Sequence, residues 1–251
     1  MDCTVTQKRA ANLLVECLIN QGVDKIYGVP GESYLSVLDA LYDFSNKINF
    51  ISTRHESAAS FMAEAYGKLT GEVGICFVTR GPGATNASIG VHTAMQNSSP
   101  MILFIGQIGR DMTEREAFQE IDYKAYFGSI SKWVVQVNNA DRLPEIIGRA
   151  FSVALSGRPG PVVVSLPEDM LRDLTSAVAI NKIQKTCAEI SVTQVNLIKD
   201  ELENSKKPLI ICGGGGWSDI GRDYLKRFAE SVNIPVICGF RNQDLMDTNS
   251  F

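Results

Sequence analysis

Apolar residues along the first two thirds of the chain follow two alternating patterns. Six short apolar or β-branched runs have the length that is typical of strands, at 24–28, 49–52, 73–78, 101–105, 132–135 and 161–166. Between them, apolar residues recur at helical spacing near 10–22, 33–41, 54–71, 85–96 and 141–157. Strands that alternate with helices predict an α/β fold, a doubly wound parallel sheet with helices on both faces.

The segment 54–71 is expected to be an amphipathic helix that ends at Gly71. Its apolar stripe consists of Ala58, Met62, Ala65, Tyr66 and Leu69. The small residues Ala58, Ala59, Ala63 and Ala65 are expected to let another helix approach closely. Glu56 falls in the first turn, where the helix dipole favours a carboxylate whether or not it has another role. Thr6 and Asp141 are the expected N-caps of the first and last helices of this region.

The strand at 73–78 leads directly into Thr79-Arg80-Gly81-Pro82-Gly83-Ala84-Thr85-Asn86. Gly81-Pro82-Gly83 is interpreted as a turn in which the backbone can come close to a ligand, because glycine has no side chain to keep it away. In open α/β sheets, ligands bind at the carboxyl ends of strands. The pattern therefore predicts a binding site after this strand.

Composition excludes several classes of protein. A hydrophobic content of 45% and a charged content of 21% are typical of a globular protein, and the net charge of −4 does not favour nucleic acid as a partner. We find no apolar run of bilayer length and no secretory signal at the N-terminus. The six cysteines lack Cys-x-x-Cys spacing and two histidines are too few for a histidine metal site, so we expect a cytoplasmic protein and predict no metal ligands.

The pattern also predicts two domains. Residues 1–171 form the first domain, 172–188 lack a sustained period and are interpreted as a linker, and 189–251 contain the opening of a second, incomplete α/β domain. A glycine run, Gly213-Gly214-Gly215-Gly216, follows a strand of that second domain. It does not fit Gly-x-Gly-x-x-Gly, so a nicotinamide site is not predicted.

Five motifs, in one order, resemble the pyrimidine-binding domain of thiamine-diphosphate enzymes of the acetolactate synthase group. They lie within 23–41, 55–71, 81–86, 117–120 and 157–162. The resemblance runs from about Thr6 to Leu171 and is weaker beyond. It implies that Glu56 is the carboxylate that bonds a pyrimidine nitrogen and thereby makes the exocyclic nitrogen a base. Glu56 and Gln119 are accordingly the expected catalytic residues.

The resemblance also implies the other roles in the site. Pro30, Pro82 and Asn86, with Glu56, match cofactor-binding positions, although Asn86 could equally serve as a helix cap. The expected substrate pocket consists of Gly31, Glu32, Phe118 and Lys132, and Lys132 could equally be a solvated lysine before a strand.

Two departures from the family pattern affect the substrate. Acetolactate synthases usually have Pro-Gly-Gly-Ala where this chain has Pro30-Gly31-Glu32-Ser33. Pyruvate decarboxylases have an acid at the position of Glu32, but their His-His pair is absent from Gly106-Gln107-Ile108-Gly109. A carboligase is therefore favoured over the alternative, a 2-oxo acid decarboxylase that releases an aldehyde.

The implied parent enzyme decarboxylates a 2-oxo acid such as pyruvate and transfers the two-carbon unit to a second carbonyl. Its cofactors would be thiamine diphosphate and Mg²⁺, the latter held by a Gly-Asp-Gly domain that this chain lacks, and FAD is found in some members. The chain alone is therefore expected to be inactive. We expect a homodimer or homotetramer, and a non-catalytic pairing module is the remaining alternative.

Overall fold

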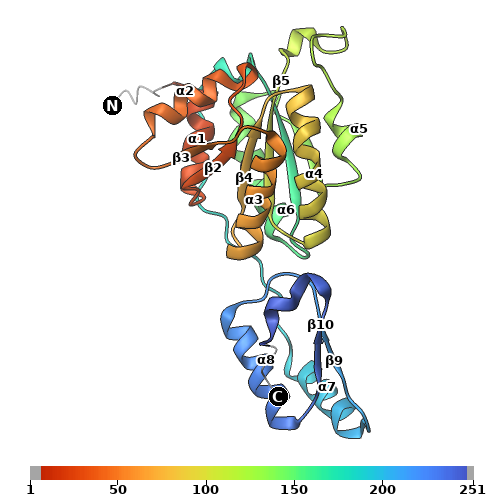
Figure 1. Ribbon diagram of the computed structural model, residues 1–251. Coiled ribbons are helices and arrows are strands. Elements are labelled where there is room, and N and C mark those ends of the chain that lie inside the picture. Colours follow the sequence, from red (N-terminus) through yellow and green to blue (C-terminus); the bar gives the residue numbers. More distant parts are fainter. Residues whose placement is uncertain (1–6, 248–251) are drawn as a thin grey trace, which may run out of the picture. The chain divides into compact units, whose positions relative to one another are not determined.

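The computed structural model describes residues 7–247, so the expected cap Thr6 lies outside the described residues. The chain divides into two compact units, Met1–Lys185 and Thr186–Phe251. The first contains a sheet of six parallel strands in the order β3-β2-β4-β5-β7-β6 (Figure 1). The strands are β2 Lys25–Gly28, β3 Asn49–Ser52, β4 Gly74–Val78, β5 Met101–Gln107, β6 Trp133–Gln136 and β7 Pro161–Pro167.

Helices cover both faces of this sheet, which confirms the predicted fold class. One face packs against α1 Ala10–Asn20, α2 Leu35–Asp43 and α6 Leu143–Leu155, and the other against α3 Glu56–Thr70, α4 Gly81–Asn97 and α5 Tyr123–Phe127. Successive strand residues point to opposite faces, as Ile75 and Phe77 do relative to Cys76 and Val78. Both faces are apolar, which is why the central strands β4, β5 and β7 are buried throughout and almost entirely apolar.

The order of the strands creates a switch point between β2 and β4. The helix that follows β2 packs on one face of the sheet, and the helix that follows β4 packs on the other. The chain therefore leaves the carboxyl ends of these two neighbouring strands in opposite directions. A crevice between such ends is where open α/β sheets bind their ligands.

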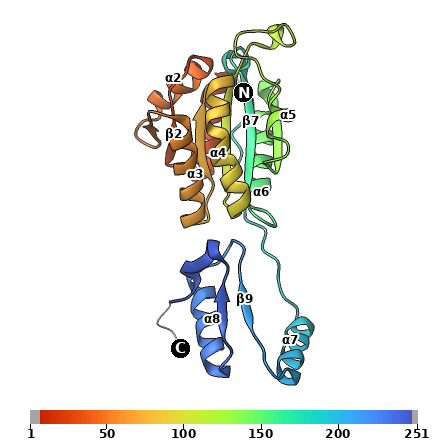
Figure 2. The ribbon, with the colours of Figure 1, turned by 45° about the vertical axis from the view of Figure 1, so that its right-hand side comes forward.

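Helices α3 and α4 lie side by side and approach closely (Figures 1 and 2). The face of α3 that is buried consists of small or polar residues, Ala59, Ser60, Ala63, Glu64 and Gly67. The predicted apolar stripe is therefore wrong for four of its five residues: Met62 and Leu69 are 39% and 84% exposed, Ala58 and Ala65 are exposed too, and Tyr66 packs against the core. The expected close approach is confirmed at the small residues Ala59 and Ala63, which are buried. Close helix packing needs small side chains, so the larger apolar ones face outward.

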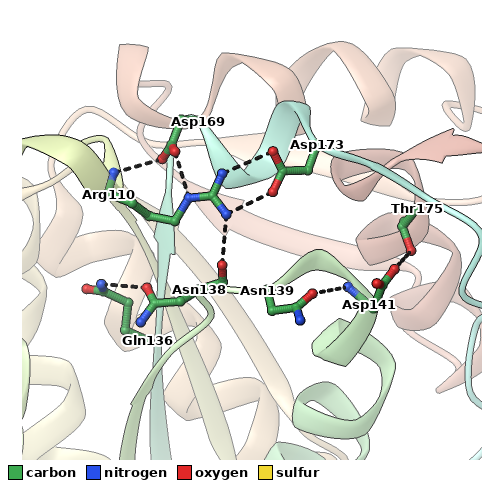
Figure 3. A network of polar contacts seen from close by, with 8 residues as sticks. All are labelled: Arg110, Gln136, Asn138, Asn139, Asp141, Asp169, Asp173 and Thr175. Carbon is green, nitrogen blue, oxygen red and sulfur yellow. Dashed lines mark hydrogen bonds and ion pairs between the residues drawn. The ribbon is translucent and has the colours of Figure 1, made fainter.

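Two predicted boundaries also differ. Gly81-Pro82-Gly83 does not form a separate loop before the helix but is the start of α4 itself. A proline is tolerated there because the first N–H groups of a helix have no intrahelical partner. Asp141 does not cap a helix. The side chain of Asn139 accepts from the Asp141 backbone instead, and the Asp141 carboxylate accepts from Thr175 Oγ1 at 2.6 Å (Figure 3).

The first unit extends beyond Leu171. Strand β8 Leu174–Thr175 pairs antiparallel with β1 Lys8–Arg9. Ile180 and Ile183 pack against the core, so part of the expected linker belongs to the first unit. Short 3-10 helices complete the described chain: η1 Glu32–Tyr34, η2 Arg110–Met112, η3 Ala140–Arg142, η4 Met170–Arg172 and η5 Phe240–Leu245.

The second unit contains two parallel strands and two helices: α7 Val192–Asn204, β9 Ile210–Cys212, α8 Asp219–Val232 and β10 Val236–Cys238. Its helices bury few residues, since α7 buries none and α8 buries Ala229. Across residues 7–247, none of the helices has the length and apolar character that crossing a bilayer requires.

Candidate functional site

Glu56 begins α3, directly after β3. The His55 side chain caps this helix by accepting from the Ser57 backbone at 3.2 Å, so the first turn has a fixed geometry. One carboxylate oxygen of Glu56, Oε2, accepts from Asn86 Nδ2 at 2.9 Å. The other, Oε1, lies 3.4 Å from where a Cβ on Gly83 would be. The structure thus brings Glu56, Asn86 and the first turn of α4 together.

The two strand ends of the switch point touch each other. A Cβ on Gly31 would lie 2.6 Å from the Cβ of Thr79, and Ser33 Oγ is 2.9 Å from Thr79 Oγ1. Gly31 follows β2 and Thr79 follows β4, so the segments after these two neighbouring strands are in contact. Pro30 and Pro82 lie in these two segments, at the same edge of the sheet as Glu56.

The charge of Glu56 is felt by two buried neighbours. Burial raises the pKa of the Tyr34 hydroxyl and of the Cys76 thiol well above their ordinary values, and the negative charge of Glu56 adds to the shift in both. The Tyr34 hydroxyl donates to the carbonyl of Val29. The Tyr34 hydroxyl and the Cys76 thiol therefore stay protonated and uncharged, and neither supplies a positive charge to balance Glu56.

An arginine that sequence reasoning missed lies at the same edge. Arg80 is 9% exposed, and its guanidinium donates to Glu32 Oε1 at 2.5 Å and lies 3.8 Å from Glu168 Oε2. Tyr123, which is also buried, lies beside Gly81. A signal existed in the sequence, because Arg80 is a charged residue immediately after a buried strand, where desolvation demands a partner.

Gln119 is held in the site by its backbone. Its φ of 66° lies in the left-handed region, and its carbonyl accepts from the N–H of Gly81 at 3.1 Å. The Glu120 carboxylate accepts from the backbone N–H groups of Glu114 and Ala117, which ties the surrounding loop to itself. The neighbouring Phe118 is 73% exposed. The irregular segment predicted to be functional is thus a folded loop against the start of α4.

Arg110 fastens the beginning of this loop to the end of β7 (Figure 3). Its Nε donates to Asp169 at 2.6 Å, its other nitrogens bond Asp173, and it also donates to the Asn138 carbonyl at 2.8 Å. Burial alone would raise the pKa of Asp169, but the bonds from Arg110 outweigh burial and hold this pKa below its ordinary value. The hydrogen bonds to Asp173 and to Asp169 in turn raise the pKa of Arg110.

The structure does not bring Lys132 to this group, so its expected place in the substrate pocket stays a prediction. It precedes β6, and its backbone N–H donates to the carbonyl of Pro161, the first residue of β7. In a parallel sheet this is the amino edge, opposite Glu56. The ammonium donates to the carbonyls of Val153 and Ser156 at the end of α6, and burial lowers the pKa of Lys132.

The fold and the arrangement of side chains define an α/β protein with a switch point between β2 and β4 and a carboxylate at the start of a helix on the same edge of the sheet. Comparison with known proteins is more specific. Residues 8–126 match the family described as thiamine pyrophosphate enzyme, N-terminal TPP binding domain, and residues 195–250 match the thiamine pyrophosphate enzyme central domain. The two matches together span more than half of the chain, which therefore belongs to the thiamine pyrophosphate enzyme family, as the resemblance predicted.

Similar curated proteins include acetolactate synthase isozyme 3 large subunit of Escherichia coli, 36% identical over 234 residues that make up 91% of this chain and 41% of that protein. The acetolactate synthase catalytic subunit, mitochondrial, of Saccharomyces cerevisiae is 34% identical over 252 residues, which are 94% of this chain and 36% of the yeast protein. The acetolactate synthase large subunit of Lactococcus lactis is 35% identical over 236 residues, 90% of this chain and 40% of that protein. The chain thus spans about two fifths of the relatives that it matches.

Proposed function

We propose that this chain is the N-terminal part of a thiamine-diphosphate-dependent carboligase resembling acetolactate synthase. The parent reaction would remove CO₂ from a 2-oxo acid such as pyruvate and transfer the two-carbon unit to a second carbonyl. The observation that carries the proposal is the Glu56–Asn86 pair beside Gly83 at the switch point. The family matches and the acetolactate synthase relatives support it.

The residues at the switch point fit an aminopyrimidine. Glu56 Oε2 is held by Asn86, which leaves Oε1 as the oxygen that can bond a ring nitrogen. Glu56 would therefore hold a proton between Oε1 and a ring nitrogen, and Asn86 would keep the carboxylate oriented. When bound, thiamine diphosphate supplies the electron sink for decarboxylation and carboligation. Pro30 and Pro82 would pack on the ring from the two strand ends.

We assign the substrate side of the site to residues around Gly81. Gln119 would point toward the reacting groups, because its backbone is fixed by the bond from Gly81. Gly31, Glu32 and Phe118 would line the pocket, and the exposure of Phe118 leaves its ring free for contacts with substrate. Lys132 is left out of the proposed pocket because its ammonium is bonded at the opposite edge.

Two further groups are part of the proposal without assigned ligands. Mg²⁺ would accompany the diphosphate, and residues 7–247 contain no cluster of three or more potential metal ligands, so we assign it no residue here. FAD would belong to the central domain. There, Gly214 and Gly216 adopt positive φ after β9 and leave backbone open to a pyrophosphate.

We also propose that two copies pair through the outer face of α3 and α4, in a homodimer or a homotetramer. This face presents the side chains that the close helix packing leaves outside, namely Phe61, Met62, Leu69 and Ile89, exposed by 38%, 39%, 84% and 52%. A group of large apolar side chains on two adjacent helices is typical of an interface. Sedimentation velocity should show a dimer that Met62→Glu shifts toward monomer.

A cytoplasmic location completes the proposal. The described cysteines, Cys17, Cys76, Cys187, Cys212 and Cys238, are free thiols, and burial raises the pKa of Cys17 to about 11. Cys17, Cys76 and Cys212 are buried and burial raises the pKa of each thiol, so these three stay protonated, which suits a reducing compartment.

The experiment that tests the cofactor site is a titration of the chain with thiamine diphosphate and Mg²⁺, followed by thermal unfolding and by the amide signals of α3 and α4. Glu56→Gln should weaken the response roughly tenfold or more, as loss of a charge-assisted bond predicts. Glu72→Gln, at an exposed acid two residues beyond the C-terminal end of α3, is the control. A thiamine analogue with carbon in place of the pyrimidine nitrogen should bind wild type and Glu56→Gln equally.

The same titration separates the alternatives. No response from wild type would favour a non-catalytic pairing module over a cofactor-binding domain. For a full-length relative that contains this sequence, acetaldehyde as the main product from pyruvate would favour the decarboxylase, and acetolactate the carboligase.

A further inference from the structure

A buried arginine bridges the two strand ends of the switch point. Arg80 follows β4, and the carboxylate that it bonds, Glu32, follows β2. The second carboxylate near it, Glu168, follows β7. Arg80 therefore sits in the crevice where ligands of this fold class bind, with acids on two sides.

Arg80 uses few of its hydrogen-bond donors. A guanidinium has five N–H groups. Within the described residues the Arg80 side chain donates one hydrogen bond, to Glu32, and its buried Nε has no partner. Buried donors without partners are rare in folded proteins, so this arrangement calls for another acceptor.

A second unpaired donor lies next to it. The hydroxyl of Tyr123 is buried and also has no hydrogen-bond partner among residues 7–247. Burial raises the pKa of Tyr123, and the nearby Gly81 N–H and the charge of Arg80 partly offset that rise. The Gly81 N–H itself is taken by the Gln119 carbonyl. Two buried donors without partners, one of them cationic, thus lie near the start of a 17-residue helix.

The two acids beside Arg80 are held differently. The Glu32 side chain is 66% exposed, whereas that of Glu168 is 39% exposed. An exposed carboxylate loses little when it turns away to water. A buried guanidinium, in contrast, needs a counter-ion in every state, because an unpaired buried charge is strongly unfavourable. Glu32 can therefore be exchanged for another carboxylate, and Glu168, 3.8 Å from the guanidinium, remains as a counter-ion if the Glu32 charge is removed.

We propose that Arg80 anchors the carboxylate of the substrate, and that Glu32 is the resident counter-ion which this carboxylate replaces. This inference rests on the proposed function, since a 2-oxo acid is the substrate class. The planar fork of arginine matches a carboxylate, and the site already accommodates one. Tyr123 supplies a further donor once the crevice is occupied. Arg80 and Glu32 then determine which substrates bind, by charge.

The test follows the Nε–H resonance of Arg80 in the chain, assigned by its loss in Arg80→Lys, during titration with pyruvate and with its uncharged methyl ester. Pyruvate should shift this resonance and the ester should not. Glu32→Gln should lower the dissociation constant for pyruvate about three- to tenfold, the range of an ion pair with one part-exposed member. Glu145→Gln, which breaks the exposed pair with Arg142, should leave it unchanged.

Equal shifts with pyruvate and its ester, or unchanged pyruvate affinity in Glu32→Gln, would overturn the inference. The outcome is separable from that of the proposed function. If pyruvate binds as expected but thiamine diphosphate gives no Glu56-dependent response, the carboxylate site stands and the cofactor proposal falls. The reverse result removes the carboxylate site alone. Because Glu32 is exposed, Glu32→Gln keeps the test valid even if Arg80→Lys destabilises the fold.

Discussion

Replacing Gly90 with alanine should force α3 and α4 apart. A Cβ at residue 90 would lie 2.5 Å from the Cβ of Ser60 and 2.7 Å from its carbonyl carbon. The second contact is with backbone, so no side-chain rotation relieves it. Ser60 follows Glu56 by four residues, and Gly90 follows Asn86 by four. The contact therefore lies one helical turn below the Glu56–Asn86 hydrogen bond and sets the spacing of that pair.

The magnitude is a difference of two effects. Overpacking of this kind costs about 1–3 kcal/mol. Alanine in place of glycine inside a helix stabilises the folded state by about 1 kcal/mol, because alanine has the higher helix propensity. Because the clash includes backbone, we place the net loss in the free energy of unfolding at about 1–2 kcal/mol, or a fall of roughly 2–8 °C in the Tm of the first unit.

The assay is calorimetry of the chain, with Gly148→Ala as the matched control. Gly148 lies in helix α6 of the same unit, and its new Cβ would meet the flexible end of Ile180, so the helix-propensity gain should dominate. Ser60→Gly should partly rescue Gly90→Ala, and the Asn86 side-chain amide resonance should move in Gly90→Ala. If Gly90→Ala were as stable as the control variant, the helix spacing would not be set by this contact and the reasoning would be refuted.

Three further predictions concern stability. Asp169→Asn should lower the free energy of unfolding by about 1–3 kcal/mol, because it weakens the bonds from Arg110. The pKa of Asp169 is depressed in the folded protein, so its contribution to stability is present above the ordinary carboxyl pKa of about 3.9 and is lost as the pH falls below it. Urea unfolding should therefore show the stabilities of the two proteins converging in acid. A constant gap would contradict this. Lys132→Met should lower the free energy of unfolding, measured by urea titration, by about 1–2 kcal/mol, because the carbonyls at the end of α6 lose their donor. If Lys132 served only to bind substrate, the stability would not change. Gly71→Ala should cost about 1–2 kcal/mol from its φ of 72° alone, since the space around it is open, and an unchanged Tm would argue against that conformation.

The sequence by itself determined the alternation of strands and helices, and with it the sheet, because runs buried on both faces must be apolar throughout. It also placed Glu56 in the first turn of α3, because helix starts are set by local residues. For the faces of α3 it was right about Ala59, Ala63 and Tyr66 and wrong about the rest of the apolar stripe. Periodicity identifies the face with the most apolar residues, but the close approach of α4 requires the face with the smallest side chains. Ala59, Ala63 and Gly67 therefore face inward.

Only the tertiary structure decided how distant segments meet. Lys132 and Glu56 both lie next to strands, yet strand direction places them at opposite edges of the sheet. Arg80, Glu32 and Glu168 come from three different strand ends, and their pairing follows from strand order, which no local pattern encodes. Helices and strands are determined by residues that are close in sequence. The order in which the parallel strands assemble determines which charged residues meet in a buried, weakly screened environment.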